Sequence, residues 1–230
     1  MRDVSFVEGE IYHVCNKAIA GNRIFSDAAN RHRFLETALL VNDLDPRQLE
    51  WRREQFRSSG KIGDHDSSAL IDTYALSLMP DHMHFLVRQK IEGGIPKFFQ
   101  RLLNSFSKYY NIKHSRRGPL FIGPYKAVHI ESDAQAAHIF TYIHGNPLDL
   151  VEPLWRGGII GERNKAIKFL QEYEWSSLGA YAENVKTNPL IKKIINPSFA
   201  NDYFADGDEY LRAVIEWGER NDVNDIENFE

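Results

Sequence analysis

Hydrophobic residues form two runs around a short polar break in the stretch 73–87, TYALSLMPDHMHFLV. Two apolar runs, 74–79 and 83–87, flank a Pro-Asp turn signal, and each has the length and composition of a β-strand. Side chains at i and i+2 leave a strand on the same face, so His82 and His84 should project together. The stretch therefore predicts two adjacent strands with a pair of imidazoles on one face.

The rest of the pattern predicts a sheet with crossing helices. Apolar spacing indicates further strands and helices, at 9–16, 26–42, 95–112, 120–130 and 132–146. Ser132 and Gln135 have the capping-box spacing at the start of the last helix, and Gly123-Pro124 interrupts the last strand. The resulting order predicts an α+β, ferredoxin-like fold, with an antiparallel sheet of four to five strands and packed helices.

The pattern also suggests how the chain is divided. We expect a catalytic domain over residues 1–150, with the charged segment 43–69 as an insertion in it. Residues 151–200 are less regular and are expected to pack on the core as a C-terminal extension. Residues 201–230 form an acidic tail with one helical pattern at 207–219. We expect a solvated, mobile helix there, and the alternative is a helix that shields the basic face until DNA displaces it.

Composition excludes several classes of protein. Hydrophobic residues at 43 % and charged residues at 26 % are ordinary for a soluble globular protein. The one cysteine, Cys15, excludes a disulfide framework and a cysteine zinc site, and its strand context suggests a small buried hydrophobe. No apolar run approaches the ~18 residues of a membrane span, so a cytoplasmic protein with no membrane partner is expected.

The net charge of −4 conceals an asymmetry. Residues 93–130 contain no acid, whereas 201–230 hold ten acids against two arginines. The acid-free window combines aromatic residues with seven cations, which are Lys97, Arg101, Lys108, Lys113, Arg116, Arg117 and Lys126. Cations bind phosphates and aromatic faces stack on unpaired bases, which favours a single-stranded nucleic acid as partner. An amphipathic helix with a solvated cationic face is the alternative that stays open.

The helix 132–146 carries the second set of candidate residues. His138, Tyr142 and Asn146 recur at four-residue spacing and share one face of the helix. If this helix lies over the sheet, it brings Tyr142 and Asn146 to the histidine pair. Two imidazoles begin a divalent metal site, but two ligands rarely hold an ion, so a third donor is needed.

These motifs resemble those of the single-tyrosine HUH transposase family. The name describes histidine, hydrophobe, histidine, here His82-Met83-His84, and the family's second motif resembles Tyr142-Ile-His-Gly-Asn146. The extended YIHGNP is similar to the REP-associated tyrosine transposases and other small insertion-sequence transposases, as are YHVCN, GPLFIGPYKA and YEWSS elsewhere in the chain. The resemblance covers roughly residues 10–182. Each motif is weak alone, and the set is specific because order and spacing agree.

The resemblance implies a function and a site. His82, His84 and Asn146 would hold Mg²⁺ or Mn²⁺, and Tyr142 would attack a phosphodiester to form a 5′-phosphotyrosine, with His138 as an orienting residue. The expected protein is a metal-dependent single-stranded DNA endonuclease and strand transferase. It would act in DNA transposition and recombination on hairpin DNA of a mobile or repetitive element. Weaker candidates for DNA contacts are Lys108, Arg116, Arg117 and Lys126.

Several alternatives stay open. A domesticated relative would bind hairpin nucleic acid without cutting it, and a metallohydrolase would use the histidine pair with Asp81 and no covalent step. Tyr109 and Tyr110 are rival nucleophiles, although neither has an amide four residues later. His13 is expected to be a bystander or a phosphate contact. The site is expected either within one chain or shared across a homodimer.

Overall fold

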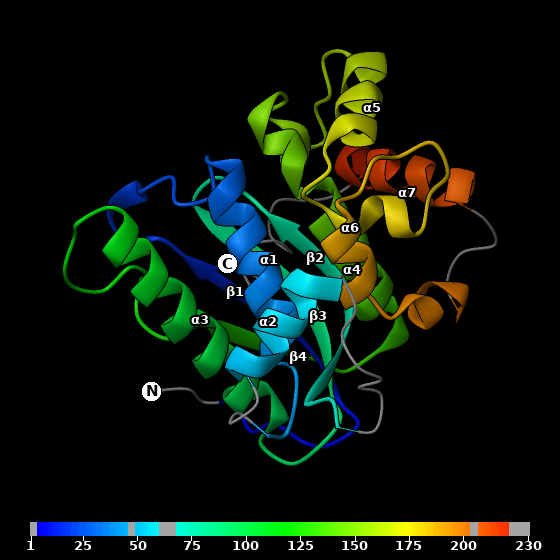
Figure 1. The fold of residues 1–230 in the computed structure, drawn as a ribbon. Coiled ribbons are helices and arrows are strands. Elements are labelled where there is room, and N and C mark those ends of the chain that lie inside the picture. The colour runs from blue at the N-terminus through cyan, green and yellow to red at the C-terminus, as the bar shows by residue number, and fades with distance from the viewer. Residues whose placement is uncertain (1–3, 46–48, 60–67, 203–206, 221–230) are drawn as a thin grey trace.

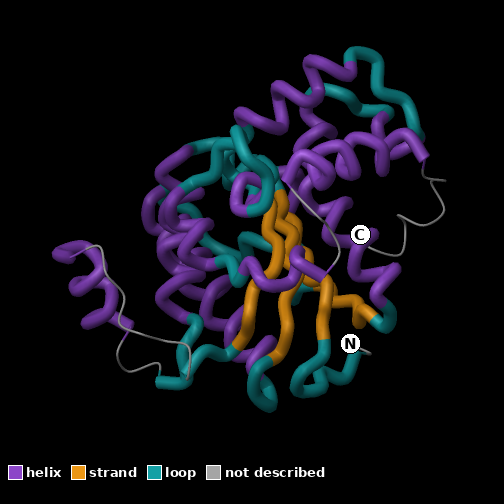
Figure 2. The backbone as a smooth tube through the Cα atoms, turned by 90° about the vertical axis from the view of Figure 1, so that its right-hand side faces the viewer, coloured by secondary structure: helices purple, strands orange, loops and turns teal. Residues whose placement is uncertain are grey.

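The computed structural model describes residues 4–45, 49–59, 68–202 and 207–220. Within these residues, strands form one antiparallel sheet in the order β2-β3-β1-β4, with bounds β1 Ile11–Lys17, β2 Ile71–Leu78, β3 His82–Gln89 and β4 Lys126–Ile130. Helices cover both sides of it, with bounds α1 Ala28–Val41, α2 Leu49–Ser59, α3 Gly94–Lys113, α4 Asp133–Gly145, α5 Arg163–Glu172, α6 Pro189–Ile194 and α7 Gly207–Arg220 (Figures 1 and 2). The predicted α+β fold with an antiparallel sheet is therefore confirmed. No helix in the described ranges combines the length and apolarity needed to cross a membrane.

The face of the sheet that packs on α1 and α3 is apolar. Val14 and Leu76 both lie opposite Phe85 in the strand register, and all three side chains are fully buried. The Phe85 ring meets Phe99 of α3 edge-on, with 5.6 Å between ring centroids. Full burial of such a side chain contributes about 1.5–3 kcal/mol, so this layer supplies much of the folding free energy.

The opposite face lies under α4, which packs against β2 and β3. The register places Lys17 opposite His82, and His84 projects to the same side two residues later. The helix starts as predicted, because the Ser132 side chain accepts a hydrogen bond of 3.2 Å from the backbone N–H of Gln135. The predicted placement of this helix over the histidine pair is thus observed.

The acidic C-terminal helix does not lie free in solvent. Val214, Ile215 and Trp217 of α7 are buried in the same apolar cluster as the inner side of α4 (α7 is red in Figure 1). The expectation of a solvated helix is wrong here because its apolar residues recur at helical spacing and give the helix an apolar side. Residues 221–230 of the predicted tail lie outside the described residues, and the domain boundaries stay a prediction.

Residues after α5 close the β2 edge of the sheet. Ser176 forms a bridge with Ser77, and the hydroxyl of Tyr173 donates a hydrogen bond of 2.7 Å to the carbonyl of Leu78. The hydroxyl of Tyr181 donates in the same way to the carbonyl of Tyr74. These contacts supply hydrogen-bond partners where a bare edge strand would have none.

The prediction of a strand over 120–130 is wrong in its first half. β4 begins only at Lys126, and Phe121 makes an isolated bridge with Ala18. Gly123 has a φ of 65°, in the left-handed region, and Pro124 lacks the backbone N–H that a strand ladder uses. These two residues turn the chain into a loop beside the histidine pair.

Part of the expected insertion is described as α2, which packs against α1. Asp43 accepts hydrogen bonds from Ser68 and from the Arg52 guanidinium, and its backbone carbonyl accepts from Arg101. Arg101, one of the cations of the acid-free window, is therefore engaged with this segment. Residues 46–48 and 60–67 of the expected insertion lie outside the described residues.

Candidate active site

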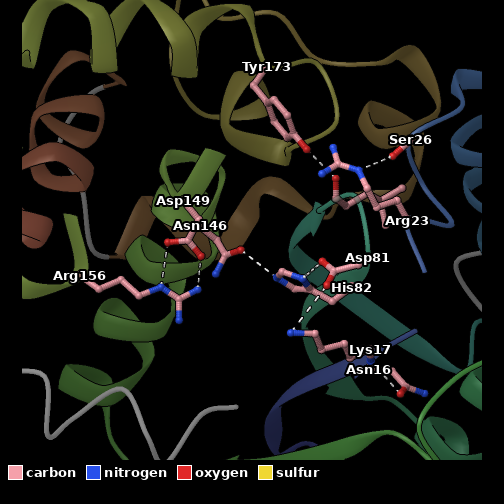
Figure 3. A network of polar contacts seen from close by, with 11 residues as sticks. Asn16, Lys17, Arg23, Ser26, Asp81, His82, Asn146, Asp149, Arg156 and Tyr173 are labelled. Atoms are coloured by element: carbon pink, nitrogen blue, oxygen red, sulfur yellow. Dashed lines mark hydrogen bonds and ion pairs between the residues drawn. The ribbon is translucent and has the colours of Figure 1, made fainter. Parts of the chain in front are cut away.

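His82 is the first residue of β3, and the preceding turn supplies its partner. Asp81 Oδ1 lies 2.7 Å from His82 Nδ1. An ionised carboxylate can only accept, so the proton of the neutral ring lies on Nδ1 and is donated to Asp81. This hydrogen bond is the main reason that the pKa of Asp81 lies below its ordinary value. Lys17 Nζ lies 3.7 Å from the second oxygen of the same carboxylate (Figure 3).

The other nitrogen of His82 faces Asn146, the residue that follows the last turn of α4. His82 Nε2 lies 3.2 Å from Asn146 Oδ1 (Figure 3). With the ring proton on Nδ1, Nε2 offers a lone pair, and the amide oxygen is also an acceptor. In this orientation the two atoms are placed to share a cation, whereas the amide turned over would donate from Nδ2 to Nε2. The ring nitrogen and the amide oxygen are both groups that bind divalent metal ions.

His84 lies deeper under α4 and is 2 % exposed. Its Nδ1 lies 3.0 Å from Nε2 of His13, and the planes of the two rings are 5° from parallel. Its Nε2 is buried and has no hydrogen-bond partner among the described residues. Burial is the main reason that the pKa of His84 lies well below its ordinary value, and the nearby charges of His82 and His13 lower it further. His84 is thus a neutral imidazole at neutral pH.

The residues present fit a divalent metal ion. No three His, Cys, Asp or Glu side chains in the described part of the chain form a metal-binding group, and Asn146 Oδ1 is the side-chain oxygen that lies next to His82 Nε2. Ligands at right angles on an octahedral ion, with bonds of about 2.1 Å, lie roughly 3 Å apart. The 3.2 Å between His82 Nε2 and Asn146 Oδ1 agrees with this spacing. Two imidazoles and an amide oxygen form a mixed nitrogen and oxygen donor set for a divalent ion, with room for water or phosphate oxygens at the remaining positions.

A cavity of about 310 Å³ opens beside the histidine pair. Its described lining combines both histidines with two cations and contains no acidic residue: Cys15, Asn16, Lys17, His82, His84, Ile122, Pro124 and Lys126. Cys15 is only half-buried, so the expectation of a buried hydrophobe is wrong, because its side shares the polar face with His84. A cationic cavity at a metal site favours an anionic ligand such as a phosphodiester.

Tyr142 lies beside His84 under an aromatic cover. Its side chain is 0 % exposed, and its ring centroid lies 5.5 Å from that of His84. Trp217 of α7 and Trp155 pack against it, at centroid distances of 5.5 Å and 6.4 Å. His138 accepts a hydrogen bond of 3.1 Å from Nε1 of Trp217, so it contacts this cover. The tyrosine is therefore next to the candidate metal site but sealed from solvent.

Arg156 adds a cation to the same side of the molecule. Its guanidinium carbon lies 5.4 Å from the centroid of the Tyr142 ring. Asp149, three residues after Asn146, holds this guanidinium through both carboxylate oxygens (Figure 3). It also accepts a hydrogen bond from Nε1 of Trp155. The ion pair of Asp149 and Arg156 therefore connects the segment after α4 to Tyr142 and to Trp155, which packs against it.

The weaker DNA candidates divide into two groups. Lys126 is exposed and lines the cavity. Arg116 donates to Asn111 Oδ1 at 2.9 Å and is engaged locally. Lys108 and Arg117 are exposed and form no ion pair within the described part of the chain. The last three belong to α3 and the turn after it, on the other side of the sheet from α4.

The rival tyrosines lie away from this site. Tyr109 and Tyr110 are on α3, half-buried against the apolar layer that α1 and α3 share. The hydroxyl of Tyr109 lies 3.5 Å from Asn30 of α1. Neither ring belongs to the cluster around Tyr142.

Sequence reasoning missed three residues at the site. His13 is no bystander, because its ring contacts His84, and Asp149 and Arg156 were assigned no role. The two-residue period of the strand places His13 on one face with Cys15 and Lys17, which was a usable signal. The pairing of β1 with β3, which brings that face to His84, has no local signal in the sequence.

A comparison with known protein families agrees with the motifs. Residues 57–146 match the family model described as IS200-like transposase. A solved structure of a REP-associated tyrosine transposase bound to a REP hairpin aligns with 83 % of this chain and 88 % of its own, with 12 % sequence identity and a TM-score of 0.46. Among curated proteins, none matches this chain. The matched segment contains His82, His84, Tyr142 and Asn146, so the predicted resemblance to this family is confirmed.

Proposed function

We propose that this protein is a metal-dependent single-stranded DNA endonuclease and strand transferase, a transposase that acts beside hairpin DNA of a mobile or repetitive element. The observation that carries the proposal is that the motif residues lie together: His82 Nε2 is 3.2 Å from Asn146 Oδ1, and the rings of His84 and Tyr142 are 5.5 Å apart between centroids. The buried lone pair of His84 and the cationic cavity support it. The preference for a hairpin rests on the family resemblance.

In this proposal the chain supplies a nucleophile and a cationic cavity that binds the phosphate. Tyr142 Oη loses its proton and bonds to phosphorus, the bond from phosphorus to the 3′ oxygen breaks, and that oxygen leaves as a 3′-OH. The covalent phosphotyrosine keeps the phosphodiester's free energy, so a 3′-OH can later attack it and rejoin strands. A bound divalent ion would polarise the phosphate and stabilise charge on its oxygens. Lys17 and Lys126 would attract the phosphate into the cavity.

The cover over Tyr142 adds one requirement. Because the ring is fully buried against Trp155 and Trp217, its hydroxyl reaches a phosphate in the cavity only after this packing rearranges. Arg156 and Asp149 lie on the same side and would hold the segment that has to move. Rearrangement would therefore precede attack in the reaction sequence.

Covalent trapping tests the proposal. The protein is incubated with Mn²⁺ and a pool of labelled oligonucleotides that carry a hairpin flanked by randomised single strands. A denaturing protein gel then separates covalent adducts from bound DNA. We expect a DNA-shifted band that requires Mn²⁺ and disappears in Tyr142→Phe, whereas Tyr109→Phe and Tyr110→Phe retain it.

The outcomes separate the alternatives. An adduct that persists in Tyr142→Phe would show that another residue is the nucleophile. Cleavage without an adduct would identify a metallohydrolase. Binding of the pool with neither cleavage nor adduct, at any Mn²⁺ concentration, would identify a hairpin-binding protein.

A further inference from the structure

The hydrogen bond between His13 and His84 can run in either direction. Its direction decides whether Nε2 of His84 has a lone pair that can bind a metal ion. Nε2 of His13 and Nδ1 of His84 lie 3.0 Å apart, and both side chains are at most 2 % exposed. A single proton lies between the two nitrogens. If His13 donates it, the proton of neutral His84 sits on Nε2; if His84 donates it, Nε2 of His84 carries a lone pair.

We infer that His84 is the donor, and that His13 is a positioning residue that holds His84 in the tautomer able to bind a metal ion. The first support is the state of Nε2 in the structure. This nitrogen is buried without a hydrogen-bond partner among the described residues, and its residue lines the cavity. Nδ1 of His13 is buried as well, so burial alone does not set the direction of the hydrogen bond. What distinguishes the two rings is the cavity, which His84 lines and His13 does not, and only a lone pair on Nε2 of His84 could bind a cation there.

The second support is a parallel with His82. Its Nδ1 faces an acceptor, Asp81 Oδ1, at 2.7 Å, and its Nε2 faces the candidate ion position. In His84 the same nitrogen, Nδ1, faces His13, and Nε2 is again the remaining atom. Metal-binding histidines usually donate their second N–H to a carboxylate, carbonyl or other acceptor, which sets the tautomer and the ring orientation. Asp81 and His13 thus occupy equivalent places behind the two rings.

The third support is the strand register. His13 lies opposite Leu86 and His84 lies opposite Cys15, so the two histidines are diagonal neighbours on adjacent strands. Backbone hydrogen bonds of the sheet hold both residues, and α4 packs against β3. An acceptor mounted on a central strand moves little, which suits a residue that orients a ligand.

This inference rests on the proposed metal site. The position of the ring proton of His84 can be observed in the protein without metal or DNA. Long-range ¹H–¹⁵N NMR on protein labelled with ¹⁵N-histidine distinguishes a protonated ring nitrogen from one with a lone pair. We expect His84 to carry its proton on Nδ1, with assignment of the signals by comparison with His84→Gln. A proton on Nε2 of His84 would overturn the inference.

Two substitutions of His13 then test its role. The side-chain amide of His13→Gln places an acceptor near the position of Nε2, whereas His13→Met fills similar volume with no comparable acceptor. Mn²⁺ binding to the DNA-free protein is followed by the loss of free-ion signal in electron paramagnetic resonance. We expect His13→Met to weaken Mn²⁺ binding about 10- to 100-fold and His13→Gln to stay within about threefold of the wild type.

His129→Met serves as the matched control, because His129 bonds to Glu10 at 2.9 Å and lies outside the cavity lining. Equal loss in His13→Gln and His13→Met would overturn the acceptor role, and wild-type binding in His13→Met would overturn the inference as a whole. If the wild type and His82→Ala bind Mn²⁺ equally, the proposed metal site fails instead. The NMR measurement still decides the tautomer in that case.

Discussion

The two faces of the sheet come from the same strands and have opposite chemistry. Toward α1 and α3, Val14 and Phe85 are apolar and sealed. Toward α4, the alternate residues include His13 and His84, which are equally buried but polar. The two-residue period of a strand makes both faces at once.

The two faces differ in the buried side chains that they present to the helices. On the side of α1 and α3, Val14 and Phe85 belong to an apolar cluster, and the hydroxyl of Tyr173 donates to the carbonyl of Leu78 at 2.7 Å. On the side of α4, Nε2 of His84 is buried with no hydrogen-bond partner among the described residues, and His84 lines the cavity. Buried polar groups usually have partners, and the proposed metal site would supply one for this nitrogen. We therefore expect substitutions on one face to change stability and substitutions on the other to change the proposed activity.

The largest expected effect is the loss of stability when a buried side chain of the apolar face is removed. Phe85→Ala should lower the free energy of unfolding by about 3–5 kcal/mol, because it leaves a cavity against α3. Thermal unfolding would shift down by roughly 10 °C. Adduct formation per folded molecule should stay within about threefold, since the side chain points away from the site. Loss of the adduct at a temperature where circular dichroism shows a folded protein would contradict the separation of the two faces, and Met83→Leu is the volume-matched control.

A substitution on the polar face should lower adduct formation strongly and change the free energy of unfolding little. His82→Ala removes a proposed ligand, and adduct formation with Mn²⁺ should fall at least 100-fold, which corresponds to about 2.7 kcal/mol of barrier. The free energy of unfolding should change by less than about 1 kcal/mol, because His82 is partly exposed at the start of β3. His129→Ala, a substitution on strand β4, which β1 separates from β3, provides the control. Equal adduct formation by His82→Ala and the wild type would remove His82 from the site.

A third prediction concerns buried tyrosine hydroxyls that have hydrogen-bond partners. Burial raises the pKa of Tyr173 to about 12, and burial also raises the pKa values of Tyr181 and Tyr210. Unfolded tyrosine titrates near ~10, so the stabilisation is complete below pH 10 and is lost as the pH rises toward 12. Each of these tyrosines should contribute a slope of about 1.4 kcal/mol per pH unit in that window. In urea unfolding at pH 9, 10 and 11, Tyr173→Phe should flatten the slope by one such step, and an unchanged slope would contradict the burial of its hydroxyl.

The sequence could predict those features that follow from the repeat of side chains along a single strand or helix. The spacing of His82 and His84 follows from the strand, and the spacing of Tyr142 and Asn146 follows from the helix. Ser132 marked the start of that helix, and its side chain accepts a hydrogen bond there. Each of these features depends on residues close together in the chain.

What the sequence could not predict depends on contacts between distant segments. His13 meets His84 only because β1 pairs with β3, a contact 71 residues apart in the chain. Trp217 covers Tyr142 only because α7 docks on α4, and an acidic helix suggested solvent instead. The left-handed φ of Gly123 shortens β4, and apolar spacing alone does not report backbone conformation.

The smallest expected effect tests which face meets DNA. Lys126 lines the cavity next to the histidine pair, whereas Lys108 lies on α3 across the sheet. If a single strand enters the cavity, Lys126→Ala should weaken its binding about threefold and reduce the slope of log affinity against log salt by about 0.7. Lys168→Ala on α5, which is also exposed, should change neither quantity and serves as the control. If Lys108→Ala alters the salt slope and Lys126→Ala does not, the strand lies on the side of α3, and the contrast between a stabilising face and a chemical face would need to be redrawn.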